Sequence, residues 1–308
     1  MDHKNRTLVP ANGGNPLGHP PVKRFGLYDL GQTTVYTASQ HPSFSYCLYV
    51  PPNFQLSAVK PELVVVVHGS PRTFMDFRDR FQDFGASENA LILSPLFPVG
   101  VQGDHNADGY KYLSEPGIRY DEVLLGMVAD VSSRYDLRFD RFALFGFSGG
   151  AQFVNRFMLL RPEWLWAASI CAPGSVTLVD DVSDWWVGTR DVESRFGLAL
   201  NRAALARVPV QTLVGAQDVD TDEITHVEGG RNWMPGANSA GRTRPERLER
   251  LRASLLAAGL SVTHEVLDGV GHDPVPMISH TKQFFAAELA RLRAAADASP
   301  CAQFPTHS

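Results

Sequence analysis

The chain has 308 residues, which is enough for one large α/β domain or two small ones. Its hydrophobic content of 44% and charged content of 20% are typical of a globular protein. The formal net charge is -5 and the sequence has no basic run, which excludes the charge pattern of a nucleic-acid-binding protein. No apolar run approaches the ~20 residues of a membrane span. From the charge pattern and the apolar runs, we therefore expect neither nucleic acid nor a membrane as a partner.

The two ends of the chain and the cysteines indicate the compartment. Residues 1–22 are polar and predict a disordered or loosely draped arm, without the apolar segment of a secretory signal. Residues 297–308 form a predicted tail. Cys47, Cys171 and Cys301 are widely spaced, without metal or redox spacing, and we interpret them as reduced thiols. These features favour a cytoplasmic location.

Strand and helix patterns run through the rest of the chain. Apolar or alternating runs predict strands over residues 25–30, 33–38, 44–50, 63–67, 90–93, 142–145, 166–170, 209–214 and 262–267. Amphipathic or capped patterns predict helices over residues 121–135, 151–160 and 243–258, and a C-terminal helix lined by Phe285, Leu289 and Leu292. Strands and helices alternate after residue 60, which predicts an α/β fold with a mostly parallel, twisted sheet and helices on both faces.

The pattern Gly146-Phe147-Ser148-Gly149-Gly150 lies between a predicted strand and a predicted helix. A serine at such a junction lies on a sharp turn, and the glycines two before and two after it remove Cβ atoms that would clash. Its hydroxyl then projects above the sheet at the positive end of the next helix. An ordinary Gly-rich turn is the alternative, but this context favours Ser148 as a nucleophile.

A nucleophilic serine needs a base, and the base needs a group that orients it. In this architecture the acid and then the histidine follow at the C-terminal ends of later strands. His272 follows the last predicted strand, and small residues before it permit a loop that folds back over the serine. We predict His272 as the base. The alternative is a loop histidine that caps the last helix.

The acid is expected after the preceding strand. Asp218 lies there, and Asp220 is the alternative two residues later. The interval from Asp218 to His272 is long for one helix and one strand, and an insertion over residues 219–242 accounts for the excess. Either carboxylate can instead be a solvated loop residue.

The oxyanion of a tetrahedral intermediate needs two backbone donors. The N–H of Gly149, next after the nucleophile, is one. The other is expected from the loop after the strand over residues 63–67, where Pro71 has no N–H and Ser70 is therefore the choice. We interpret His68 in the same loop as structural, with its imidazole packed beneath the loop.

Four segments together resemble the α/β-hydrolase superfamily over about residues 25–295: 68–70, 146–150, 215–218 and 271–272. Residues 46–51 leading into Val67-His68-Gly69 are further similar to the polyhydroxybutyrate depolymerase and feruloyl esterase branch. The resemblance implies Ser148 as nucleophile, His272 as base and Asp218 as acid. The His-Gly-x-Pro pattern also looks like epoxide hydrolases and haloalkane dehalogenases, but those have an aspartate where this chain has Ser148.

Three segments are candidates for shaping the substrate site. His105 lies on a loop over residues 103–112 and is expected to contact substrate, with a plain surface loop or a metal loop as alternatives. Trp185 and Trp186 lie in a predicted insertion over residues 174–207, where they line the substrate site or staple the insertion to the body. Acidic residues after Asp218 form either a rim that favours cationic substrates or a solvated loop.

These features predict one α/β-hydrolase domain over residues 23–296, with a small cap from residues 174–207 and 219–242. The expected reaction is hydrolysis of a carboxylic ester, on a small molecule or an oligomer, through an acyl-enzyme. Amide hydrolysis by the same triad and a non-catalytic small-molecule-binding role are the alternatives. No phosphate-binding or dinucleotide motif is present, so we expect no metal and no organic cofactor. The residues do not indicate an oligomeric state.

Overall fold

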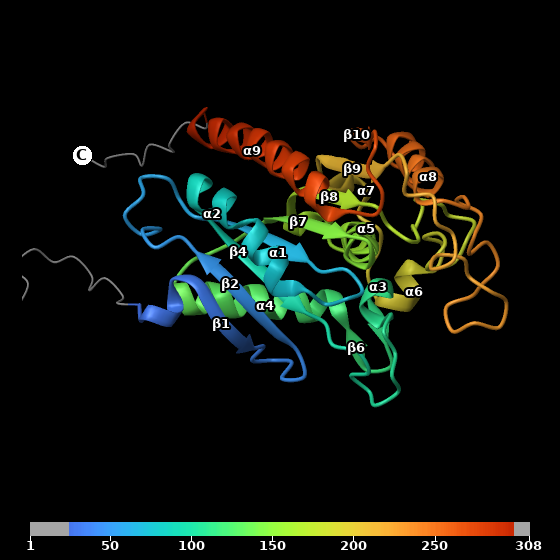
Figure 1. Cartoon of the computed structure of the whole chain (residues 1–308), viewed down its shortest axis with the longest axis horizontal. Helices are drawn as coiled ribbons and strands as arrows, with labels where there is room; N and C mark the ends of the chain where they lie inside the picture. The colour runs from blue at the N-terminus through green and yellow to red at the C-terminus, as the bar shows by residue number, and fades with distance from the viewer. Residues whose placement is uncertain (1–24, 299–308) are drawn as a thin grey trace, which may run out of the picture.

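The computed structural model describes residues 25–298, so the predicted arm over residues 1–22, most of the predicted tail and Cys301 lie outside it. Its centre is a sheet with the strand order β1-β2-β4-β3-β7-β8-β9-β10 (Figure 1). The strands are β1 (Gly31–Thr37), β2 (Ser45–Val50), β3 (Glu62–Val67), β4 (Ala90–Leu96), β7 (Phe142–Phe147), β8 (Leu165–Cys171), β9 (Val210–Gly215) and β10 (Val262–Leu267). β2 is antiparallel to both neighbours, and the remaining pairs are parallel. The predicted mostly parallel sheet is confirmed.

Helices occupy most of the connections between these strands. They are α1 (Phe74–Arg80), α2 (Gln82–Glu88), α3 (Gly109–Tyr112), α4 (Tyr120–Tyr135), α5 (Gly149–Leu160), α6 (Val192–Phe196), α7 (Arg202–Leu205), α8 (Arg244–Ala257) and α9 (Pro274–Ala298). A short 3-10 turn, η2 (Pro162–Trp164), follows α5, and a small hairpin, β5 (Ser114–Glu115) and β6 (Ile118–Arg119), precedes α4. Within residues 25–298, no helix is both long and apolar enough to cross a membrane.

The strand predicted over residues 25–30 is wrong. A 3-10 turn, η1 (Leu27–Asp29), lies there, and the Asp29 carboxylate accepts the backbone N–H of Gly26 at 3.0 Å. Leu27 and Tyr28 are exposed, and only Phe25 and Leu30, at the two ends of the run, pack against the core. A local side-chain bond to the backbone therefore decides this segment.

Alternation along β7 explains why helices cover both faces of the sheet, because successive side chains point to opposite sides. Phe145 packs against Phe81 near α1, with ring centroids 5.0 Å apart. Phe142 packs on the other side against Phe157 of α5, at 5.8 Å. Figure 1 shows α9 and α2 above the sheet and α4 below it. A strand that is apolar throughout is therefore buried by two helical layers.

Two long connections follow β8 and β9, at the ends where parallel strands carry functional groups. Residues 172–209 contain α6 and α7, and residues 216–243 lead into α8. Trp186 joins the two connections, because its indole N–H donates to the Asn232 carbonyl at 2.9 Å. The Arg231 guanidinium lies 2.8 Å from the Asp104 carboxylate and joins the second connection to the loop after β4.

Candidate active site

Ser148 lies at the junction of β7 and α5 in a backbone conformation that side chains rarely adopt. Its φ is 55° and its ψ is -113°, and its N–H donates to the Cys171 carbonyl of β8 at 2.9 Å. A Cβ on Gly146 would lie 2.2 Å from the Gly150 carbonyl oxygen, and a Cβ on Gly150 would lie 2.3 Å from the Val67 carbonyl oxygen. Only glycine fits at both positions, which is the steric reason for the predicted elbow.

Asp218 and His272 lie together at the neighbouring strand ends. His272 Nδ1 is 2.7 Å from Asp218 Oδ2, and Arg244 of α8 donates to Asp218 Oδ1 at 2.9 Å. The Asp218 side chain is buried, whereas Asp220 is exposed and accepts the Asp222 N–H. Of the two carboxylates considered from the sequence, the structure places Asp218 against the imidazole.

The loop that carries His272 packs closely on the end of β9 and beside the elbow. A Cβ on Gly215 would lie 2.2 Å from the Val270 carbonyl oxygen and 2.5 Å from that of Gly271. The His272 ring lies 4.5 Å, centroid to centroid, from the ring of Phe147, the residue before the serine. The small residue at the end of β9 thus lets the histidine loop approach the elbow.

Ser70 and Gly149 both lie next to the serine. A Cβ on Gly69 would be 3.6 Å from the Ser148 Cβ, so the loop after β3 runs directly beside the nucleophile position. A Cβ on Gly149 would be 3.3 Å from Ser70 Oγ. The structure therefore brings the two residues predicted for the oxyanion site to the same place as Ser148.

His68 holds this loop from beneath. Its Nε2 accepts the Phe97 N–H at 3.0 Å, so its Nδ1 carries the proton and donates to the Gly69 carbonyl at 2.8 Å. Burial lowers the pKa of His68 to about 3, which keeps the imidazole neutral. The structural role expected for His68 is confirmed.

The predicted substrate-contact residues lie in different settings. Trp185 and Trp186 are buried, and their indole N–H groups donate to the Tyr112 carbonyl at 3.2 Å and to the Asn232 carbonyl. These bonds staple the connection after β8 to α3 and to the connection after β9. His105 is exposed on its loop. A contact of any of the three with substrate stays a prediction.

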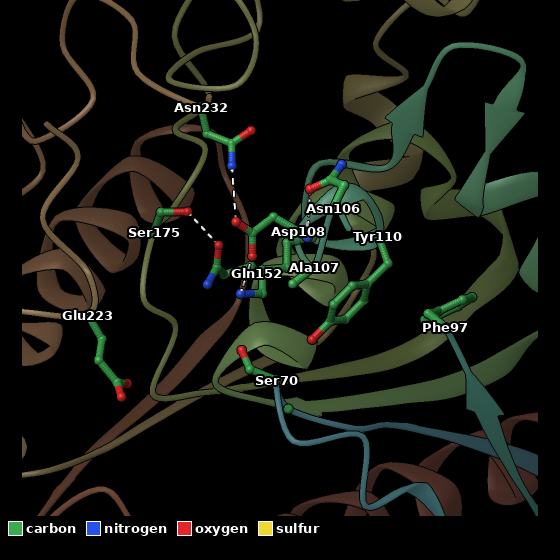
Figure 2. Close-up of polar contacts among 12 residues, drawn as sticks. Ser70, Phe97, Asn106, Ala107, Asp108, Tyr110, Gln152, Ser175, Glu223 and Asn232 are labelled. Carbon is green, nitrogen blue, oxygen red and sulfur yellow. Dashed lines mark hydrogen bonds and ion pairs between the residues drawn. The ribbon is translucent and has the colours of Figure 1, made fainter. Parts of the chain in front are cut away.

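Several polar side chains beside the elbow were not predicted. A Cβ on Gly149 would lie 2.3 Å from the Tyr110 hydroxyl and 2.9 Å from Lys111 Cε. Lys111 Nζ donates to Asp108 Oδ1 at 2.6 Å, and Gln152 lies one helical turn after Ser148. Figure 2 shows the side chains of Ser70, Asp108, Tyr110 and Gln152 gathered around one space. The turn of α3 brings Tyr110 and Lys111 there. They lie in the segment over residues 103–112 that the sequence indicated for the substrate site, but no motif marks them individually.

Metal ligands were considered for the loop after β4. Among residues 25–298 there is no group of three or more His, Cys, Asp and Glu side chains that could hold a metal ion. Asp104 instead pairs with Arg231, and its carboxylate also accepts the Asn106 N–H at 3.1 Å.

Comparison with known proteins finds the same fold in many solved structures. A poly(3-hydroxybutyrate) depolymerase, LpqC, from Bordetella parapertussis is 25% identical, with a TM-score of 0.63 over 81% of this chain and 90% of that chain. Poly(aspartic acid) hydrolase-1 from Sphingomonas sp. KT-1 is 19% identical, with a TM-score of 0.64 over 82% and 97%. A ferulic acid esterase is 17% identical, with a TM-score of 0.55 over 83% and 96%. No family model and no curated protein matches the sequence.

The strand order and these neighbours confirm the α/β-hydrolase fold. They also confirm the resemblance to α/β-hydrolase superfamily serine hydrolases, with a depolymerase and a ferulic acid esterase among the similar structures.

Proposed function

We propose that this protein is a serine hydrolase that cleaves carboxylic esters, with Ser148 as nucleophile, His272 as base and Asp218 as the group that orients the base. One observation carries the proposal: a buried carboxylate bonds His272 Nδ1 at 2.7 Å on a loop packed beside the strained elbow of Ser148. A histidine bonded in this way presents Nε2 as its free proton acceptor.

The reaction follows from this arrangement. His272 Nε2 takes the Ser148 proton as Oγ attacks the ester carbonyl, and it returns that proton to the leaving alcohol. The buried Asp218 stabilises the imidazolium, and Arg244 donates to its other carboxylate oxygen. The N–H groups of Ser70 and Gly149 bind the oxyanion. Water, activated by His272, then cleaves the acyl-enzyme to release the acid.

The preference for esters rests on similarity. The depolymerase with a TM-score of 0.63 is 25% identical to this chain over most of both lengths, and the substrate in its name is a polyester. The same triad chemistry serves amide hydrolysis, which is the alternative for this site.

A cytoplasmic site of action stays part of the proposal, and Cys47 and Cys171 are buried free thiols.

A small substrate panel tests the proposal. Pure protein is assayed with 4-nitrophenyl esters of rising chain length, an aryl ester and matched anilides, and in parallel with a fluorophosphonate probe. We expect ester turnover and covalent labelling, both lost in Ser148→Ala, because the variant keeps the fold but has no nucleophile. Anilide turnover equal to ester turnover would establish the amidase alternative. No turnover and no labelling would leave a non-catalytic binding protein.

A further inference from the structure

Two arginines beside the proposed active site are buried without a carboxylate partner. Arg156 of α5 and Arg247 of α8 are 0% and 1% exposed. In the part of the chain that the structure describes, their guanidinium groups bond only neutral oxygens. Arg156 donates to the Lys111 carbonyl (2.6 Å), Thr177 Oγ1 (2.9 Å), Ser175 Oγ (2.9 Å) and Gln152 Oε1 (3.4 Å). Arg247 donates to the carbonyls of Gly174, Ile224 (2.7 Å) and Gly241 (2.9 Å) and to Asn238 Oδ1 (3.2 Å).

Such burial is costly, because a charge removed from water is normally paired with an opposite charge. Burial lowers the pKa of Arg156 to about 10, which still leaves the guanidinium charged at neutral pH. Its faces lie over the rings of Tyr112 and Trp186, at 4.5 and 5.2 Å from the centroids. These contacts stabilise the cation but do not neutralise it, so its positive field extends into the surroundings.

Both arginines act on the same region as Lys111. Burial, together with the positive charges of Arg247, Arg156 and Lys111, lowers the pKa of His226 to about 4. The negative charge of Asp108 raises the pKa of His226 and so opposes the three positive charges. The ring of Trp186 lies against His226 at 4.7 Å and joins it to Arg156. We call Lys111, Arg156 and Arg247 the basic cluster.

The basic cluster begins next to Gly149, the residue that follows the proposed nucleophile. Lys111 Cε lies 2.9 Å from where a Cβ on Gly149 would be. Gln152, on the same face of α5 as Ser148, bonds Arg156 and Ser175. In Figure 2 the side chains of Gln152 and Asp108 both lie above Ser70, the residue proposed for the oxyanion site. A substrate bound to Ser148 therefore meets the positive field.

The acidic residues after Asp218 do not cancel this field. Asp220, Asp222 and Glu228 are exposed to solvent, where salt screens their charges. Glu223 lies 3.7 Å from Arg244 and shares that cation with Asp218. The rim is thus outside, in water. The charges without a carboxylate partner, those of Arg156 and Arg247, are inside, and Lys111, which pairs with Asp108, lies beside the elbow.

We propose that the preferred substrate is an ester that also carries a carboxylate a few bonds from the scissile carbonyl, and that Lys111 is the residue that meets this carboxylate. The inference rests on the proposed function and names the substrate class of the same site. Lys111 is the partly accessible member of the basic cluster, with a side chain 14% exposed. Arg156 and Arg247 are buried and add positive electrostatic potential from the interior.

A matched pair of esters tests the charge preference. 4-Nitrophenyl hydrogen adipate carries a terminal carboxylate, and 4-nitrophenyl methyl adipate has the same chain with the charge removed. We expect kcat/KM to favour the charged ester by ~10-fold or more in the wild type, and this ratio to fall ~10-fold in Lys111→Met. In Asp108→Asn, which removes the opposing carboxylate, the ratio should rise. A purely structural role would not shift the ratio in opposite directions.

Lys282→Met is the control, because Lys282 of α9 pairs with Asp83 of α2, and both helices lie on the face of the sheet opposite α5. Its ratio should equal that of the wild type. If Lys111→Met does not fold, two other measurements test the charge preference. The kcat/KM ratio should rise in Asp108→Asn, and added salt should lower the ratio of the wild type. A wild type that prefers the methyl ester, or ratios unchanged in both variants, would overturn the carboxylate proposal alone. Turnover of neither ester would overturn the proposed function itself.

Discussion

Two histidines with similar sequence settings take opposite roles. His68 precedes a glycine after β3, and His272 follows a glycine after β10. His68 is buried between a backbone N–H and a carbonyl, so it stays neutral. His272 is partly accessible and is bonded to the buried carboxylate of Asp218. Residue type makes both capable of proton transfer, and their surroundings leave His272 as the one available for the proposed reaction.

The buried state of His68 predicts an acid-sensitive fold. Its pKa is about 3 in the folded chain and 6.5 in the free side chain, so below pH ~6.5 the unfolded chain binds a proton that the folded chain does not. The free energy of unfolding should therefore fall as pH drops from 6.5 towards 3, by up to ~1.4 kcal/mol per pH unit from this group. Urea unfolding at pH 7 and pH 4.5 measures it.

The matched variants for that experiment are His68→Gln and His105→Gln. His68→Gln should lower stability at pH 7 and reduce the difference between the two pH values. His105 is exposed, so its variant should retain the wild-type difference. Equal pH dependence in the wild type and in His68→Gln would mean that other groups cause the acid sensitivity.

Among the elements, the ends of β9 and β10 determine where the proposed base lies. Asp218 is placed by a turn in which its N–H donates to the Gly215 carbonyl at 3.1 Å. The loop after β10 packs onto the same Gly215. β9 and β10 are neighbours in the sheet. Asp218 and His272, which are 54 residues apart in the chain, therefore lie together at the ends of these strands.

Gly215→Ala should disturb catalysis through this contact. The new Cβ would lie 2.2 Å from the Val270 carbonyl oxygen and push the loop of His272 away. A displacement near 1 Å is expected to lower kcat ~100-fold. Gly271→Ala is the control in the same loop, because a Cβ there meets nothing within 4 Å. Ester kinetics and circular dichroism check the result, and equal activity of the two variants would contradict it.

At the scale of the molecule, three connections from different parts of the chain meet at the C-terminal ends of the strands. The loop after β4 bonds the connection after β9 through Asp108 and Asn232 (3.2 Å). The connection after β8 bonds the same segment through Trp186. These contacts hold the three connections together. Their members are separated by 124 and 46 residues, so they depend on the folded sheet that brings the connections together.

Trp186→Ala should release the connection after β9. The variant loses the bond to the Asn232 carbonyl and the contact with His226, so residues 219–242 should open locally more often. We expect limited proteolysis to cut this segment several times faster than in the wild type, with the fragments identified by mass spectrometry. Trp164→Ala, on η2, is the control and should keep the wild-type pattern. Unchanged cleavage in Trp186→Ala would show that other contacts hold the segment.

Local patterns in the sequence were sufficient for the strands of the sheet and for the elbow. Buried strands read as unbroken apolar runs, and the glycines around Ser148 mark a turn that only they permit. The order of acid and histidine after the serine placed Asp218 and His272 correctly at neighbouring strand ends. The run over residues 25–30 was misjudged, because a single bond from Asp29 outweighed its apolar character.

The sequence by itself determined the fold class and the positions of the elbow and its expected partners, because periodicity, glycines and strand order are local or topological properties. Only the tertiary structure decided between Asp218 and Asp220, joined Arg244 to the acid and gathered the basic cluster. Those features consist of contacts between side chains far apart in the chain. They exist once the sheet has brought its strand ends together, and the charge left unpaired there cannot be read from any one segment.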